Sequence, residues 1–66
     1  MVEYIGKKVR EEKGYTLRSL AKKSTLAQST ISKYENGHNL PNLLQLGILA
    51  NTLGVDIMDL IHYTPD

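Results

Sequence analysis

Residues 16–37, TLRSLAKKSTLAQSTISKYENG, decide the fold expected for this chain of 66 residues. Leu17, Leu20 and Ala21 recur at helical spacing in the first half, and Ile31 and Tyr34 do so in the second. The stretch therefore predicts two short helices joined by a tight turn, each with a narrow apolar face. The outer face of the second helix has hydrogen-bonding groups and no carboxylate, and its residues are Gln28, Ser29, Ser32, Lys33 and Asn36. Such a face can meet DNA base edges and phosphates without charge repulsion.

The same stretch resembles the Cro and phage-repressor (XRE) helix-turn-helix family. The similarity extends over roughly residues 5–62, and the matching residues are Thr16, Leu20, Ala21, Gln28–Ser32, Glu35–Gly37, Pro41, LLQLGILANTLGV at 43–55 and DIMDLI at 56–61. This resemblance implies an all-α fold, a compact five-helix bundle of the lambda-repressor-like type. It places the helix-turn-helix in helices two and three, at about residues 16–37.

Length and composition indicate a single small domain over residues 1–66. A chain this short buries only about 60% of its unfolded surface, so its stability margin is small and partner association would increase it. There is no cysteine and no apolar run long enough to cross a bilayer. The first residues, MVEYIGKKV, lack the apolar stretch of a secretion signal, so we expect a cytoplasmic protein without a membrane anchor.

Enzyme chemistry has little support among the side chains. His38 and His62 are the only histidines, and they fall in different elements without metal-ligand spacing. No hydroxyl is paired with an evident base. We therefore expect no catalytic residue, no metal site and no cofactor.

The net charge of +1 is divided unevenly along the chain. Residues 1–38 hold all eight Lys and Arg and four of the seven Asp and Glu, which gives them a net charge of +4. Residues 39–66 hold the other three acids, which gives −3. A basic half that carries the outer face of the second helix would orient the molecule on a polyanion such as DNA. An ordinary mixture of solvated surface charges is the alternative.

Five helices are expected from apolar spacing and capping residues. The first spans about residues 3–13 and puts Ile5 and Val9 on one face. The second runs from its cap Thr16 to about Lys23, the third starts near Gln28, the fourth follows the cap Asn42, and a short fifth follows the cap Asp56. The fourth helix has an apolar stripe for the core, made of Leu43, Leu46, Leu49, Ala50 and Leu53.

The start of the third helix carries the residues expected to contact bases. In helix-turn-helix docking, this first turn meets base edges in the major groove. The amide of Gln28 can donate and accept a hydrogen bond at once, which matches the N6 and N7 edge of adenine. The family's base-contacting positions coincide with Gln28, Ser29 and Lys33, and Ser32 is a further candidate. The alternative is that these are ordinary polar residues on a surface helix.

A second set of residues is implied by the family to contact the DNA backbone. Asn36 matches a family residue whose amide side chain contacts a phosphate, and the loop after it usually offers main-chain amides. His38 and Asn39 lie in that loop. The amino end of helix two, from Thr16 to Arg18, also runs near the backbone in the family. Asn36 and Gly37 also suit simple helix termination, and the two roles are compatible.

Arg10 and Glu35 are expected to form an ion pair, because related repressors join an arginine of helix one to a glutamate near the end of helix three. Such a pair would hold the third helix on the bundle. Breaking it would cost about 3 kcal/mol if the pair is deeply buried. An exposed pair would contribute only about 0 to 1 kcal/mol.

Three positions depart from the family pattern. Thr25 stands where glycine is usual in the turn, and Ala27 stands where a serine or threonine usually caps helix three. A left-handed conformation is unfavourable for a β-branched residue, and a missing N-cap hydroxyl costs about 1 kcal/mol. Leu17 replaces a frequent glutamine, so we expect it to pack in the core rather than contact DNA.

An apolar surface is expected on the acidic half of the chain, at Leu44, Ile48 and Met58. Relatives usually have polar groups there, so the three residues form a candidate homodimer surface. The alternative is that the chain's own tail covers them. Together with the motif, they predict a sequence-specific, DNA-binding regulator of transcription, a repressor that binds an inverted-repeat operator as a homodimer. The competing hypothesis is an antitoxin or adaptor module that uses the same fold to hold a partner protein.

Overall fold

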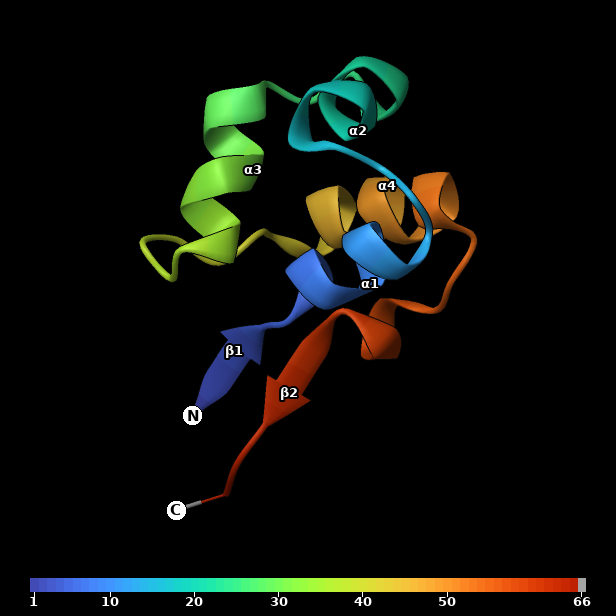
Figure 1. The fold of residues 1–66 in the computed structure, drawn as a ribbon. Helices are drawn as coiled ribbons and strands as arrows, with labels where there is room; N and C mark the ends of the chain where they lie inside the picture. The colour runs from blue at the N-terminus through green and yellow to red at the C-terminus, as the bar shows by residue number, and fades with distance from the viewer. Residues whose placement is uncertain (66) are drawn as a thin grey trace.

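The computed structural model describes residues 1–65, with four α-helices, one short 3-10 helix and two short strands (Figure 1). In chain order they are β1 (Val2–Tyr4), α1 (Gly6–Glu12), α2 (Leu17–Ser24), α3 (Gln28–Glu35), α4 (Leu43–Leu53), the 3-10 helix η1 (Ile57–Asp59) and β2 (Ile61–Tyr63). Asp66, one of the acids of the carboxy-terminal half, lies outside the described residues. None of the helices within residues 1–65 has the length and apolar character needed to span a membrane.

Reciprocal hydrogen bonds fix where α2 and α4 begin. The hydroxyl of Thr16 accepts from the Ser19 N–H at 3.0 Å, and the Ser19 hydroxyl accepts from the Thr16 N–H at 2.9 Å. Asn42 and Gln45 exchange the same two bonds at the start of α4, at 2.8 and 3.1 Å. Each pair satisfies amide groups that have no partner inside the helix. Thr16 and Asn42 are therefore the N-caps that the sequence predicted.

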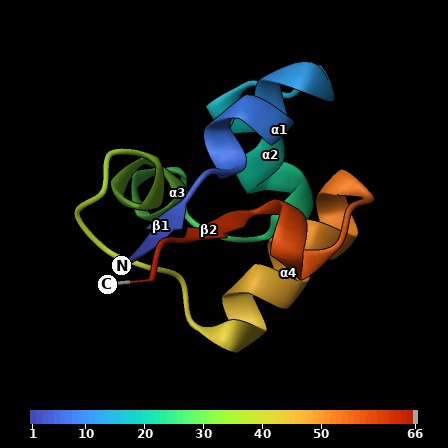
Figure 2. The same ribbon diagram turned by 90° about the horizontal axis from the view of Figure 1, so that it is seen from below.

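The core lies where α2 packs against both α3 and α4. Its fully buried side chains are Leu20, Ile31, Leu49 and Leu60, which come from α2, α3, α4 and the residue after η1. Leu17 is half-buried against this core, as expected from the sequence. Figure 2 shows α3 at one side of the molecule, with the loop to α4 running around the outside. Burial of one face of α3 leaves the opposite face in solvent.

The expectation of five α-helices is wrong at both ends of the chain. Val2–Tyr4 and Ile61–Tyr63 form a two-stranded antiparallel sheet in which Glu3 lies opposite His62. The first helix therefore starts at Gly6 rather than near Glu3, and the expected fifth helix is limited to the single turn of η1. β-branched and aromatic residues alternate with polar ones in both segments, which favours strands once each has a partner.

Two apolar residues also differ from their expected places. Leu43, expected in the core stripe, is 73% exposed, because it is the first residue of α4 and lies about one turn before the buried Leu46. Ile5, expected on the inner face of the first helix, is 40% exposed at the position before α1. Its N–H donates to the Leu60 carbonyl at 2.8 Å, which extends the sheet pairing up to the helix.

The turn between α2 and α3 accommodates both expected departures from the family pattern. Thr25 adopts the left-handed conformation with φ +64°, and it is the one non-glycine residue with positive φ within residues 1–65. Ala27 occupies the N-cap position of α3 and provides no side-chain hydrogen bond. The turn therefore keeps the helix-turn-helix geometry without the usual glycine and capping hydroxyl.

Candidate nucleic-acid interface

The two faces of α3 have opposite character. Ile31 and Tyr34 point inward and are buried, whereas Gln28, Ser29 and Lys33 are exposed. Ser32 is half-buried between the two faces. The structure thus places the expected base-contacting residues on one solvent-facing side of a helix that packs on α2.

The first turn of α3 has no capping side chain. The N–H groups of Thr30 and Ile31 donate to the Ala27 carbonyl at 3.1 Å, which is the start of the helical hydrogen-bond pattern. Because Ala27 has no hydroxyl, no side chain within residues 1–65 accepts from the first N–H groups of this helix. The positive end of α3 is therefore open to solvent next to Gln28 and Ser29.

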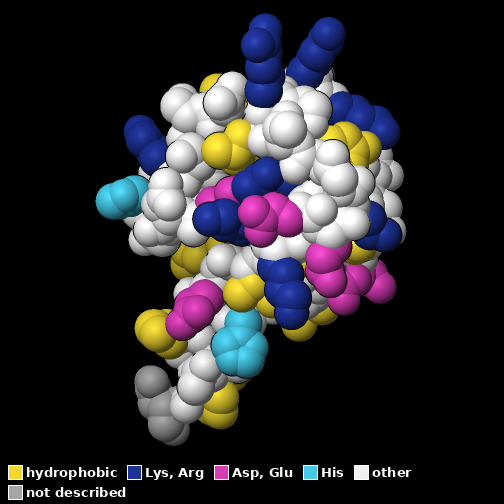
Figure 3. Space-filling view, in the orientation of Figure 1, with side chains coloured by type: hydrophobic (Ala, Val, Ile, Leu, Met, Phe, Trp, Pro, Cys, Tyr) yellow, Lys and Arg dark blue, Asp and Glu magenta, His cyan; other side chains and the backbone are white. Residues whose placement is uncertain are grey.

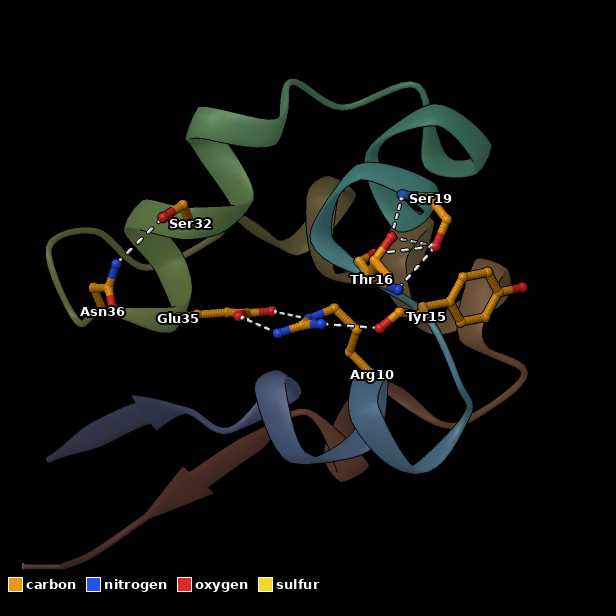
Figure 4. Close-up of polar contacts among 7 residues, drawn as sticks. All are labelled: Arg10, Tyr15, Thr16, Ser19, Ser32, Glu35 and Asn36. Carbon is orange, nitrogen blue, oxygen red and sulfur yellow. Dashed lines mark hydrogen bonds and ion pairs between the residues drawn. The ribbon is translucent and has the colours of Figure 1, made fainter.

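The amino end of α2 is arranged differently, because its capping groups already have partners. Thr16 and Ser19 are exposed, and their hydroxyls are joined at 3.1 Å in addition to the two capping bonds (Figure 4). Arg18, the first basic residue of α2, is also exposed. Ser19 was not expected from the sequence, because it stands where the usual capping box has Glu or Gln.

Asn36 and Ser32, two expected DNA-contact residues, are hydrogen-bonded to each other. The side-chain amide of Asn36 donates one hydrogen bond to the Ser32 hydroxyl, at 3.3 Å (Figure 4). This bond does not use the side-chain oxygen of Asn36 or its second amide hydrogen. Asn36 is exposed, as are His38 and Asn39 in the loop that follows. The carboxy end of α3 therefore presents polar side chains to solvent.

Most main-chain amides after α3 already have partners within the protein. The N–H groups of Asn36 and Gly37 donate to the carbonyls of Ser32 and Tyr34 at 3.0 and 3.2 Å. Those of His38 and Asn39 both donate to the Lys33 carbonyl, at 2.9 and 3.4 Å. These four amides close the end of α3 and are occupied, whereas the Leu40 N–H, in the same loop, makes no hydrogen bond within residues 1–65.

Arg10 and Glu35 form the ion pair expected from the sequence. The Arg10 Nε donates to Glu35 Oε2 at 2.7 Å, and its Nη2 donates to Oε1 at 3.0 Å. The Arg10 Nη1 also donates to the Tyr15 carbonyl at 2.9 Å (Figure 4). The two side chains are only 9% and 4% exposed, which favours the buried alternative. The hydrogen bond to Glu35 raises the pKa of Arg10 although burial opposes this, so the pair stays charged.

Four of the eight Lys and Arg belong to α2 and α3, whose one acid, Glu35, is paired with Arg10, and the other four belong to α1 and the residue after it. In Figure 3, Lys and Arg side chains project from the edge that carries α2 and from the side that carries α3. Asp and Glu lie mainly across the front and lower parts of the same view, with some basic side chains among them. The division of charge along the sequence therefore becomes a partial division in space, with its basic side at α2 and α3.

The expected dimer surface is only partly exposed. Leu44 and Met58 are 73% and 70% exposed, whereas Ile48 is half-buried. Leu44 and Ile48 are one turn apart on α4, and η1, which carries Met58, packs against α4. The terminal residues that the structure describes pair with β1 and leave Leu44 and Met58 uncovered.

Tyr4 and Gln45 were not identified from the sequence, yet both contact α3 at its buried side. The Tyr4 ring meets the Tyr34 ring edge to face, with ring centres 5.9 Å apart. It also fills the space that a side chain would need at Gly6, which explains the glycine at the start of α1. Gln45 accepts a hydrogen bond from the Tyr34 hydroxyl. A signal for Gln45 was its position three residues after the cap Asn42.

Within residues 1–65 there is no cluster of three or more His, Cys, Asp or Glu with the geometry to hold a metal ion. The polar side chains described above are instead distributed along α2, α3 and the loop after α3. They form an open surface.

Comparisons with known proteins agree with this architecture. The chain has no match among curated proteins. Eight chains of solved structures match it, and one is a Bacteroides fragilis protein whose crystal structure is described as that of a candidate DNA-binding protein. That structure has a TM-score of 0.87 and 34% sequence identity, and the alignment covers 94% of this chain and 100% of the other. A helix-turn-helix family model matches residues 7–60, and the chain therefore belongs to the XRE family of helix-turn-helix proteins.

Proposed function

We propose that residues 1–66 form one helix-turn-helix domain that binds double-stranded DNA sequence-specifically and regulates transcription, acting as a repressor. The observation that carries this proposal is the exposed face of α3. Its outward side chains Gln28, Ser29 and Lys33 donate or accept hydrogen bonds and include no carboxylate, while Ile31 and Tyr34 hold the helix on the core. Family membership and the similarity to the Bacteroides fragilis protein support the same function.

In this proposal the first turn of α3 enters the major groove. Gln28 and Ser29 contact base edges there, and Ser32 and Lys33 extend the contact along the helix. The open positive end of α3 faces the polyanion. The polar groups at this end require partners when water is displaced, and base edges provide donors and acceptors.

Backbone contacts flank this site in the proposal. Thr16 and Arg18 approach phosphates from the start of α2, and Asn36, His38 and Asn39 approach them from the end of α3. All five are exposed. Because the main-chain amides of residues 36–39 are occupied within the protein, the side chains of Asn36, His38 and Asn39 provide the contacts there. Contacts of this kind set the register of α3 on the duplex without reading its sequence.

The proposal includes a homodimer that occupies an inverted repeat. Leu44 and Met58 provide exposed apolar surface for the second copy, and Ile48 contributes the part of its side chain that is not buried. Two copies related by two-fold symmetry place their α3 helices in successive major grooves, about 34 Å apart. A protein that binds DNA would act in the cytoplasm, which is the location expected from the sequence. The proposed function involves no catalytic step.

A second candidate function has one observation in its favour. Leu43 and Leu44 are consecutive residues at the start of α4, and each is 73% exposed. Exposed apolar side chains of this kind suit an antitoxin or adaptor that holds a partner protein. Such a module needs no preference among DNA sequences. Binding of DNA therefore distinguishes the two candidates.

The test combines selection of bound duplexes from a random library with affinity measurements at several salt concentrations. We expect a common inverted repeat among the selected duplexes and a higher affinity for it than for random DNA. The logarithm of the affinity should fall linearly with the logarithm of salt, at about 0.9 per phosphate neutralised. Equal affinity for selected and random duplexes would reject sequence-specific regulation, and a flat salt response would reject DNA as the ligand.

A further inference from the structure

Tyr34 connects α3 directly to the start of α4. Its side chain is on the buried face of α3, with 4% of the residue exposed, and its hydroxyl donates to Gln45 Oε1 at 2.5 Å. The same oxygen accepts from the Asn42 N–H at 3.1 Å, and the Gln45 N–H donates to Asn42 Oδ1 at 2.8 Å. The Tyr34 hydroxyl is therefore joined to the N-terminal cap of α4 through one shared oxygen.

The carboxy end of α3 is held by further contacts at the same place. The Tyr4 ring from β1 meets the Tyr34 ring in an edge-to-face arrangement, with an angle of 63° between the ring planes. Glu35, the next residue, is paired with Arg10 of α1. Elements on three sides, β1, α1 and α4, thus hold residues 34 and 35.

The amino end of α3 lacks comparable polar contacts. Ala27 provides no capping bond, Gln28 and Ser29 are exposed, and Ile31 is the buried side chain of that half of the helix. The amino half of α3 is therefore held by apolar packing of Ile31 against the core, whereas the polar contacts that fix the helix direction lie at residues 34 and 35. Gln28 and Tyr34 are six positions apart, a rise of about 9 Å, so a tilt of about 6° at Tyr34 moves Gln28 by about 1 Å.

We propose that Tyr34 is a positioning residue for sequence specificity, and that its hydrogen bond to Gln45 sets the direction in which α3 presents Gln28. This inference rests on the proposed function. Base-edge hydrogen bonds tolerate little displacement, whereas contacts between lysine or arginine and phosphate tolerate much more. Loss of the Tyr34 hydroxyl therefore reduces affinity for the selected duplex and leaves affinity for random DNA almost unchanged.

The experiment measures the ratio of affinities for the selected duplex and for random DNA, together with stability to urea. In Tyr34→Phe the ring remains and the hydrogen bond to Gln45 is lost. The ratio should fall about fivefold, which is the effect of losing one hydrogen bond between the displaced Gln28 and a base. Tyr15→Phe is the matched control, because it removes a hydroxyl that accepts from Lys23 Nζ at 2.8 Å and does not contact α3. Its ratio should equal that of the unmodified protein.

Variants of Gln45 test the mechanism. Gln45→Glu keeps an acceptor oxygen and a favourable residue at the start of α4, so it should retain the ratio. Gln45→Met removes the acceptor and should lower the ratio about as much as Tyr34→Phe. Combining Gln45→Met with Tyr34→Phe should give little further loss, because both changes break the same bond.

The outcomes separate this inference from the function on which it rests. If the unmodified protein prefers no duplex, the proposed function fails, and the inference fails with it. If the unmodified protein is specific and Tyr34→Phe retains the ratio, the inference is wrong and the function stands. A loss of stability in Tyr34→Phe with an unchanged ratio also overturns it, since that result assigns the bond to folding alone.

Discussion

The guanidinium of Arg10 and the carboxylate of Glu35 meet in two hydrogen bonds, at 2.7 and 3.0 Å, although the residues are 25 positions apart. They join α1 to the last residue of α3. Both side chains are buried, so each charge has the other as its main compensation. The pair therefore makes the position of α3 dependent on a helix outside the helix-turn-helix.

Removing the charge of Glu35 should destabilise the fold strongly. Glu35→Gln leaves the buried guanidinium of Arg10 without a counterion, and we expect the free energy of unfolding to fall by about 3 kcal/mol. Urea denaturation measures this change. Glu12→Gln is the control, because Glu12 is exposed on α1 and its replacement should change stability by less than about 0.5 kcal/mol. A similarly small loss for Glu35→Gln would mean that the pair does not hold α3.

Gln28→Ala tests base contact. The change should weaken binding to the selected duplex by about 1 to 3 kcal/mol, because a bidentate contact with a base is lost, and it should hardly alter binding to random DNA. Titration of both duplexes provides the measurement. Equal losses on the two duplexes would contradict a base-contacting role for Gln28.

Asn36→Ala should behave in the opposite manner. A contact between its side chain and a phosphate is independent of sequence, so affinity should fall to a similar degree for every duplex. The Asn36 main-chain N–H, which donates to the Ser32 carbonyl, remains in the variant and preserves the end of α3. Titration of duplexes that differ at single base pairs checks the prediction. A loss confined to one base pair would assign Asn36 to base contact instead.

Tyr4→Phe should stabilise the protein, more so at high pH. The Tyr4 hydroxyl is buried without a hydrogen-bond partner within residues 1–65, so its removal should add about 1 kcal/mol at pH 7. Burial, helped by the charge of Glu35, raises the pKa of Tyr4 from 10.0 to about 12. The unfolded chain thus loses this proton first, so ionisation of Tyr4 has no effect on the free energy of unfolding well below pH 10 and lowers it progressively as the pH rises toward 12.

The free energy of unfolding of Tyr4→Phe should consequently exceed that of the unmodified protein by about 1 kcal/mol more at pH 11 than at pH 9. Urea denaturation at each pH gives the two curves. Tyr63→Phe is the control, because Tyr63 is exposed and its replacement should leave the pH dependence unchanged. Parallel curves for Tyr4→Phe and the unmodified protein would contradict the assignment to Tyr4.

Leu44→Glu tests the dimer with less risk to the fold than a change at the half-buried Ile48. We expect a folded monomer that binds the full inverted repeat far less tightly, since its two halves are no longer joined before binding. Sedimentation gives the mass. Leu43→Glu is a matched control, because Leu43 is equally exposed and points about 100° away around α4. A monomeric unmodified protein at high concentration, with selected sites that lack two-fold symmetry, would reject the dimer.

The helix-turn-helix was predictable from sequence because its determinants are local. Thr16 marks the start of α2 through hydrogen bonds that involve only nearby residues, and outside the motif Asn42 marks the start of α4 in the same way. The pairing of Arg10 with Glu35 is long-range, and it was predicted only through the resemblance to related repressors. The residues of α3 that face solvent followed from the inward positions of Ile31 and Tyr34.

The errors concern features that depend on distant partners. Each strand of the sheet has three residues, too few to distinguish alternation from a helical pattern, and its partner is at the other end of the chain. Leu43 continues the apolar stripe of α4, yet it is exposed as the first residue of that helix. Likewise, the contact between Tyr34 and Gln45 requires the relative placement of α3 and α4, which residue spacing does not specify.

Pairing of β1 with β2 also has a consequence for the order of folding. The Met1 amine and the Thr64 carbonyl that it contacts are 63 positions apart, and closing a loop of about that length costs about 4 kcal/mol of chain entropy. The contacts between α2 and α3 close far shorter loops. We therefore expect the helices to assemble first and bring the two ends together, and the sheet to form last. On the reverse path, the strands separate first, so their amide hydrogens exchange with solvent through a local opening that leaves α2 and α3 folded.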